Sequence, residues 1–178
     1  GDLYKDGINR GLFMPFIEEI TARCEVVAVA GDRDWRRDRM AGSPVWFSPD
    51  DAQARDGFET LWADLKGGET EEPTHLSVTG RDVVIQRTIG SLARASFADL
   101  CQRPLGASDY LAMADRFHTL FLSDLPCLSS DERQAAKRFV TLIDALYEAR
   151  VRLVVLAQAE PDALYPVGDG AFEFERTV

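Results

Sequence analysis

The two segments Thr119-Leu120-Phe121-Leu122 and Val151-Arg152-Leu153-Val154-Val155-Leu156-Ala157 decide the fold. Nearly continuous apolar runs of this kind are typical of strands that are buried on both faces of a sheet. Between them, Ser129 and Glu132 have the spacing of a capping box, which predicts that a helix begins there. A strand, a helix and a second strand in this order form a right-handed parallel crossover. The sequence therefore predicts an α/β fold with a sheet covered on both faces.

The helix between these strands is predicted to be amphipathic. Apolar side chains recur at helical spacing along one stripe, while Lys137, Asp144 and Glu148 fall on the opposite, polar face. The members of the stripe are Ala135, Phe139, Leu142, Ile143 and Leu146. This stripe should pack on the sheet.

A hairpin is predicted upstream of the crossover. Residues 75–78 and 82–88 alternate between apolar and polar across the turn Thr79-Gly80-Arg81, and residues 91–97 can add a third strand. Ser108 is predicted to cap the helix that follows, on which Tyr110 and Phe117 share a face.

Another helix is predicted after Ser48-Pro49-Asp50-Asp51, a segment with a cap residue, a proline for the first turn and two acids. Its apolar positions are Ala54, Phe58, Leu61, Trp62 and Leu65. Gly67-Gly68 should end this helix, and the polar residues 69–73 are predicted to form an exposed loop.

The first forty residues predict a helix, a strand and a charged loop. Pro15 can begin a helix that runs to Arg23, and residues 24–30 alternate little and are rich in valine, which favours a strand. Residues 32–39 are mostly charged and should leave the sheet as a loop.

Composition limits the function classes. The chain has 178 residues and a net charge of −10, which disfavours non-specific attraction to nucleic acid or anionic lipid. No apolar run approaches the roughly 18 residues of a membrane span. The three cysteines are too few and scattered for a disulfide framework or a zinc site, so we expect a soluble, intracellular protein with no metal site.

Several separated blocks resemble one family in the same order. They are Leu3-Tyr4-Lys5-Asp6-Gly7, Phe13-Met14-Pro15-Phe16-Ile17, Asp34-Trp35-Arg36, residues 95–101, residues 104–110, residues 138–147 and Glu173-Phe174-Glu175-Arg176-Thr177. In these blocks the chain is similar to the AFG-type, or ZapE-like, AAA ATPases. Ordered blocks are more specific than any single short pattern.

This resemblance implies a partial P-loop NTPase-like fold, with a parallel sheet, flanking helices and an inserted β-hairpin. It implies ATP hydrolysis by an oligomer of the full-length protein, in bacterial cell division or membrane-protein quality control. The location that it implies is the bacterial cytoplasm, with association with the inner face of the membrane as an addition. Partners would be a homo-oligomer and a division-machinery or membrane-associated protein. The chain contains no G-x-x-x-x-G-K-[ST] phosphate loop, so the family's ATP and Mg²⁺ would bind to residues that precede Gly1, and neither is expected to bind tightly to this chain alone. The family also continues past Val178.

The resemblance also implies roles for three arginines. Arg10 follows a glycine and an asparagine and would be the arginine finger that acts on the nucleotide of a neighbouring subunit; the alternative is a surface arginine paired with Asp6. Arg138 and Arg176 are candidates for cofactor binding as nucleotide sensors, although Arg138 could instead flank a helix and pair with an acid.

The implied domains are residues 1–40, the distal part of the ATPase core; residues 41–73, a helical insert with an acidic loop; and residues 74–178, the hairpin and the C-terminal α/β region.

Other residues leave alternatives open. Asp124 ends an apolar strand and could hold magnesium, in a stand-alone α/β enzyme, or lie in a loop before Pro126. Arg81, Arg87 and Arg94 could form a basic face, although the net charge argues against nucleic-acid binding. The alternative to the ATPase is a non-catalytic protein-binding module, in which residues 51–66 and the acidic loop dock a partner.

Overall fold

The computed structural model describes residues 44–165, together with Pro15, Glu19 and Arg23. The chain divides into two compact units, Gly1–Ala41 and Gly42–Val178. In the first unit, Pro15, Glu19 and Arg23 are helical, and Arg23 Nη2 lies 2.6 Å from Glu19 Oε1 one turn away. These three residues agree with the predicted helix. The predicted strand over residues 24–30 and the charged loop over residues 32–39 lie outside the described residues.

The described part of the second unit is built on one six-stranded sheet with the order β1-β6-β5-β4-β3-β2. Strands β1, β6, β5 and β4 are parallel neighbours, whereas β3 is antiparallel to β4 and β2 is antiparallel to β3. The strands are β1 (Trp46–Phe47), β2 (Glu72–Val78), β3 (Arg81–Ile89), β4 (Leu92–Ser96), β5 (Thr119–Leu125) and β6 (Arg152–Ala157). The helices are α3 (Ala52–Lys66), the π-helix η1 (Ala98–Gln102), α4 (Ala107–Arg116), the 3₁₀-helix η2 (Ser130–Glu132), α5 (Arg133–Glu148) and α6 (Pro161–Leu164). The prediction of a P-loop NTPase-like α/β fold with flanking helices and a β-hairpin is confirmed.

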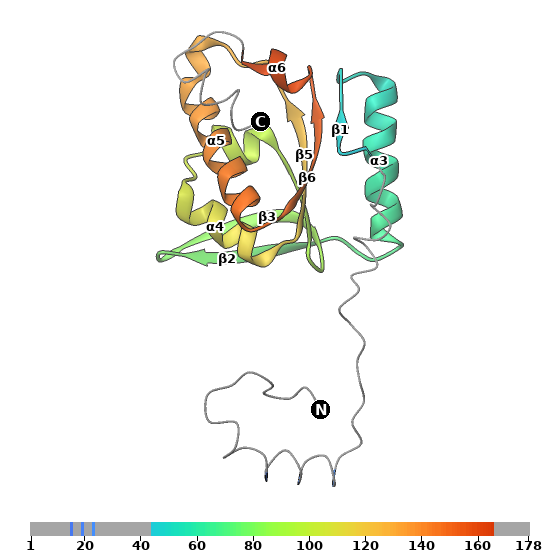
Figure 1. Cartoon of the computed structure of the whole chain (residues 1–178), viewed down its shortest axis with the longest axis vertical. Helices are drawn as coiled ribbons and strands as arrows, with labels where there is room; N and C mark the ends of the chain where they lie inside the picture. Colours follow the sequence, from blue (N-terminus) through green and yellow to red (C-terminus); the bar gives the residue numbers. More distant parts are fainter. Residues whose placement is uncertain (1–14, 16–18, 20–22, 24–43, 166–178) are drawn as a thin grey trace. The chain divides into compact units, whose positions relative to one another are not determined.

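Helices cover both faces of the sheet, as the apolar strands required. α3 lies on one side, and α4 and α5 lie on the other (Figure 1). In β5, Leu120 and Leu122 join the core beneath α5, whereas the Phe121 ring packs edge-on against Phe58 and Trp62 of α3, at centroid distances of 5.3 and 5.0 Å. Alternate residues of one strand therefore attach the two layers.

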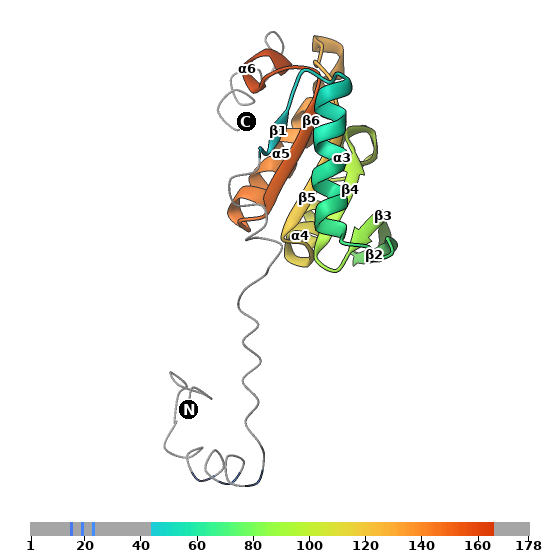
Figure 2. The ribbon, with the colours of Figure 1, turned by 90° about the vertical axis from the view of Figure 1, so that its right-hand side faces the viewer.

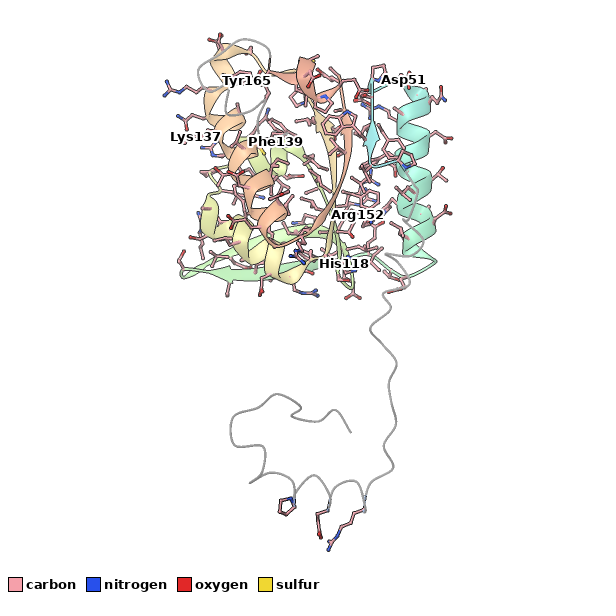
Figure 3. All side chains as sticks on the ribbon, viewed as in Figure 1. Asp51, His118, Lys137, Phe139, Arg152 and Tyr165 are labelled. Carbon is pink, nitrogen blue, oxygen red and sulfur yellow. The ribbon has the colours of Figure 1, made fainter. Side chains whose placement is uncertain are left out.

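The predicted apolar stripe of α5 faces the sheet. Phe139 and Leu142 are fully buried in the core cluster. Figure 3 shows the Lys137 side chain pointing away from the sheet on the same helix. Ser129 N donates to Glu132 Oε2 at 3.0 Å, so the predicted capping box is confirmed, although the 3₁₀-helix η2 precedes α5.

Two predicted helix caps were wrong. The N-cap of α3 is Asp51, whose side chain accepts a hydrogen bond from Ala54 N at 2.8 Å, rather than Ser48. The N-cap of α4 is Gly106, and Ser108 lies inside the helix. Gly106 N donates to Asp109 Oδ2 at 2.8 Å, so the acid in the first turn does the capping.

The predicted end of α3 is confirmed. Gly67 has a φ of 59°, and its N–H bonds to the carbonyl of Ala63. This left-handed conformation favours glycine because a side chain would clash there.

The hairpin is confirmed. The exposed loop predicted over residues 69–73 is confirmed for residues 69–71, but β2 already begins at Glu72. In β2 one residue, Pro73, lies between the paired positions Glu72 and Thr74, whereas in β3 two residues, Gln86 and Arg87, lie between their partners Thr88 and Ile85. This β-bulge changes which face successive residues of β3 present. Ile85 and Thr88 are buried, while the Arg87 guanidinium lies 5.9 Å from the centroid of the Trp62 ring of α3.

Candidate functional site

Arg10 and Arg176 lie outside the described residues. Their roles as arginine finger and nucleotide sensor therefore stay predictions.

Arg138 is the remaining predicted cofactor-binding residue. It lies on α5, and its Nη1 donates a hydrogen bond to the carbonyl of Cys101 at 3.1 Å. This contact joins α5 to the end of the π-helix η1, and the Arg138 side chain is half-buried. In this conformation Arg138 binds the backbone of its own domain.

A polar cluster lies between α3 and the sheet. Arg94 of β4 is 8% exposed and donates to both carboxylate oxygens of Glu59 on α3. Its guanidinium also lies over the Phe58 and Trp62 rings, 5.1 and 5.8 Å from their centroids. The hydrogen bonds from Arg94 lower the pKa of Glu59 despite some burial. An arginine in this setting is a bidentate, ring-stacked anchor for the helix.

A second carboxylate completes this cluster. Glu71 accepts hydrogen bonds from Arg87 Nε and Nη2, from Trp62 Nε1 at 3.0 Å and from Lys66 Nζ at 3.3 Å. These donors, Arg87 first, lower the pKa of Glu71 to about 2. Glu71 thus joins the end of α3 to the hairpin.

The three arginines considered as a basic face have separate carboxylate partners. Arg87 and Arg94 bind Glu71 and Glu59 at α3, and Arg81 binds Asp109 at the start of α4. Their charges are neutralised locally, and α3 and α4 lie on opposite faces of the sheet (Figure 1).

Asp124 lies within β5, and not in a loop, at an irregularity between Leu122 and Leu125. It has a φ of 58°, which is uncommon for a residue with a side chain. Its carboxylate accepts from Ser123 Oγ at 2.7 Å, lies 3.8 Å from Arg55 Nη1, and is 54% exposed. The register pairs Ser96 of β4 with Ser123, so both serines and Asp124 stand at the carboxyl ends of parallel strands. This edge is where α/β sheets present groups to ligands.

The described residues do not fit a magnesium–nucleotide site. Asp124 is occupied by Ser123 and Arg55, and Arg138 is occupied by a backbone carbonyl. In the described part of the chain, no group of three or more histidine, cysteine, aspartate or glutamate residues is arranged to hold a metal ion. No catalytic step on ATP follows from residues 44–165.

Both histidines make side-chain contacts, and Cys101 is a buried free thiol. His75 Nδ1 lies 2.5 Å from Asp82 Oδ2 across the hairpin, and His118 Nδ1 lies 2.8 Å from Thr119 Oγ1. Burial raises the pKa of the Cys101 thiol to about 12, which disfavours the nucleophilic thiolate.

The described helices include none with the length and apolar character needed to cross a membrane.

Sequence patterns missed Glu59, Glu71 and Asp109 as partners of the hairpin arginines. Each acid is far from its arginine in sequence, by 35, 16 and 28 positions. The available signal was the three arginines themselves, since cations on the strands of a buried sheet require nearby carboxylates.

The described residues form an α/β domain of the P-loop NTPase class. The polar cluster between α3 and the sheet is structural, and two serines and an aspartate lie at the carboxyl edge of the sheet. The family model described as AFG1-like ATPase matches residues 1–178, and the chain belongs to this family. It is 31% identical over 175 residues to the cell division protein ZapE of Escherichia coli (strain K12), covering 98% of this chain and 47% of that protein. It is 35% identical over 170 residues to lactation elevated protein 1 homolog B of Danio rerio, covering 94% of this chain and 34% of that protein.

A third relative, the uncharacterized protein C115.02c of Schizosaccharomyces pombe, is 32% identical over 172 residues, covering 93% of this chain and 37% of that protein. The chain spans about a third to a half of the length of these relatives. No solved structure matches.

Proposed function

We propose that this chain is the C-terminal portion of an AAA-type ATPase that hydrolyses ATP as a full-length oligomer in the cytoplasm. The observation that carries the proposal is the family match over residues 1–178. Full-length members of the family use ATP and Mg²⁺. The printed name of the bacterial relative supports a role in cell division. The proposal also includes a division-machinery or membrane-associated protein partner.

Arg10 is the proposed catalytic residue of this chain. Its guanidinium would act in trans on a nucleotide that another stretch of protein binds, as arginine fingers do. An Arg10→Ala variant of the full-length protein should lose about 10³-fold in turnover and keep ATP affinity. An Arg23→Ala variant is the control, because Arg23 is an exposed helical arginine paired only with Glu19 among the described residues. Turnover by Arg10→Ala equal to that of the control would reject the finger.

Arg138 and Arg176 are proposed as nucleotide sensors in the same oligomer. For Arg138 this role requires it to exchange the Cys101 carbonyl for the nucleotide. Alanine at either position should then raise the KM for ATP of the full-length enzyme. If Arg138→Ala loses stability but its KM for ATP is unchanged, Arg138 is not a nucleotide sensor, and its role is the hydrogen bond to the backbone carbonyl of Cys101.

The alternative is a non-catalytic protein-binding module that retains the family fold. The exposed side of α3, which carries Asp56 and Asp64, supports this alternative because it faces away from the sheet. Full-length protein that binds a partner but hydrolyses no ATP, even with Arg10 intact, would favour the module.

A further inference from the structure

A half-buried cation lies between α5 and η1 without a carboxylate partner among the described residues. Arg138 donates one hydrogen bond, from Nη1 to the carbonyl of Cys101, and its other N–H groups have no hydrogen bond to the part of the chain that the structure describes. A neutral carbonyl offsets only part of the charge of a guanidinium, and a cation that is partly removed from water is stabilised by a nearby carboxylate. The surroundings of Arg138 therefore favour binding of an acid from outside the described residues.

The buried groups beside Arg138 do not supply a negative charge. Burial raises the pKa of the Cys101 thiol to about 12, although Arg138 acts in the opposite direction. Burial also raises the pKa of the Tyr110 phenol, whose OH donates to the carbonyl of Leu100 at 2.8 Å. Both groups are therefore neutral at physiological pH, and the charge of Arg138 is left uncompensated by them.

A second cation without an ion pair follows η1. Arg103 is exposed, lies two residues after the carbonyl that Arg138 binds, and makes no ion pair within the described residues. Asp99, in the same π-helix, accepts from Ser96 N at 3.2 Å and from Ser96 Oγ at 2.6 Å, and does not pair with Arg103. Two cations at the end of η1, in a chain of net charge −10, form a local positive surface that favours an acidic partner.

The described part of the chain ends beside the start of α5. The N–H of Leu128, in the loop before α5, donates to the carbonyl of Leu164 at 2.6 Å, and Leu164 and Tyr165 are buried in the core cluster. Figure 2, like Figure 1, shows α6 at the carboxyl end of β6. The chain from Tyr165 to Glu173 can span up to about 26 Å, whereas Arg138 lies only about 8 Å along α5 from its start. The residues around Glu173 can therefore reach Arg138.

We propose that residues 171–178 of this chain bind the positive surface, with the carboxylates of Glu173 and Glu175 paired with Arg138 and Arg103. In an extended chain, side chains two residues apart point to the same side, so both acids face the cations while Arg176 points to the other side. The tether through Tyr165 gives this segment a high effective concentration at the surface, which an untethered acid lacks. The pairing does not rest on the proposed nucleotide contacts, although it brings Arg176 close to Arg138.

The test is cross-linking of the full chain without nucleotide, so its outcome is independent of the ATPase proposal. Arg138→Lys and Arg103→Lys keep the positive charge and provide an amine, which a water-soluble carbodiimide joins to a carboxylate in contact with it. Mass spectrometry of the digested monomer should identify links from residues 138 and 103 to Glu173 or Glu175. Lys137 is the internal control, because it is exposed and points away from the sheet (Figure 3), and its links to these acids should be at least about fivefold fewer.

Further variants locate the acids. Glu173→Gln combined with Glu175→Gln should remove the links, whereas Glu148→Gln, at an exposed acid of α5, should leave them unchanged. Arg103→Lys is a conservative change at an exposed position, so the test does not depend on how the Arg138 variant folds. A mixture of chains labelled with ¹⁴N and ¹⁵N distinguishes a segment bound within its own chain from one bound to a second copy.

Three results would overturn the proposal. The first is that residues 138 and 103 link to Glu173 and Glu175 no more often than Lys137 does, which is also the result expected if a nucleotide phosphate is the partner of Arg138. The second is that the links join light chains to heavy chains, which would make a second copy the source of the segment. The third is that the two introduced lysines link to other acids in place of Glu173 and Glu175.

Discussion

The Arg94 guanidinium is held between the Glu59 carboxylate and the Phe58 and Trp62 rings, so that one charged group joins β4 to α3. The two partners differ in exposure, because Arg94 is 8% exposed and the Glu59 side chain is 55% exposed. Removing the carboxylate leaves a buried cation without its counter-charge, whereas removing the cation leaves a carboxylate that water can reach.

This asymmetry predicts the order of two variants. Glu59→Gln should lower the free energy of unfolding by about 2–3 kcal/mol. Arg94→Met keeps an apolar stem against the rings and should cost only about 1 kcal/mol. Urea unfolding measures both, with Asp56→Asn on the exposed side of α3 as a control expected within about 0.5 kcal/mol of wild type. The reverse order would show that the pair is not buried as the structure has it.

Glu71 predicts a dependence of stability on pH. Its pKa is about 2 in the folded chain, chiefly because of Arg87, against an ordinary value of 4.5. A carboxyl group with a lowered folded pKa contributes stability above its unfolded pKa, and this contribution is lost as the pH falls toward the folded value. The stability difference between wild type and Glu71→Gln should therefore be largest near neutral pH and shrink between about pH 4.5 and pH 2.

The measurement is urea unfolding at several pH values, with Glu72→Gln as the neighbouring control. Glu72 is exposed, in contrast to Glu71. A difference between wild type and Glu71→Gln that stays constant with pH would contradict the assigned contact.

Gly67 predicts a backbone effect at the end of α3. Its φ of 59° is strained for alanine, so Gly67→Ala should lose about 1 kcal/mol in the free energy of unfolding. Gly67→Asn is the matched variant, because asparagine tolerates this conformation, and it should lose less. If thermal unfolding shows equal losses of stability for Gly67→Ala and Gly67→Asn, the surroundings of the added side chain determine the loss, and the φ of residue 67 does not.

Much of the fold could be predicted because burial leaves a periodic trace in the sequence. The runs around Phe121 and Val154, the stripe that includes Phe139, and the alternation across Gly80 all correspond to observed elements. Each prediction depended only on neighbours in the same element.

Caps and polar partners could not be predicted in the same way. The sequence predicted Ser48 and Ser108 as N-caps, whereas the observed N-caps are Asp51 and Gly106. Several adjacent residues can begin a helix, and tertiary packing decides which one does. Glu71 was assigned to an exposed loop because its polarity was visible in the sequence and its donors were not. The bulge in β3 turns Arg87 toward Glu71, and no alternation pattern predicts a bulge.

The Arg81–Asp109 pair tests whether the cost of breaking an ion pair is larger when the partner that remains is the buried one. Here the exposures are reversed, since Asp109 is 0% exposed and Arg81 is 49% exposed. Asp109 Oδ2 also accepts from Gly106 N, and its Oδ1 is buried without a hydrogen-bond partner. Arg81→Met should therefore cost about 2–4 kcal/mol, because it leaves the carboxylate buried with no cation.

Asp109→Asn should cost less, about 1 kcal/mol, since an amide oxygen can still accept from Gly106 N and water can reach Arg81. If the loss of stability in Arg81→Met comes from the carboxylate left without a cation, the variant that combines Arg81→Met with Asp109→Asn should be no less stable than Arg81→Met alone. Urea unfolding of wild type, the two single variants and the double variant gives the coupling energy between the two residues directly. Additive losses would show that Arg81 acts through its own packing on the hairpin, and the link between the hairpin and α4 would then not be electrostatic.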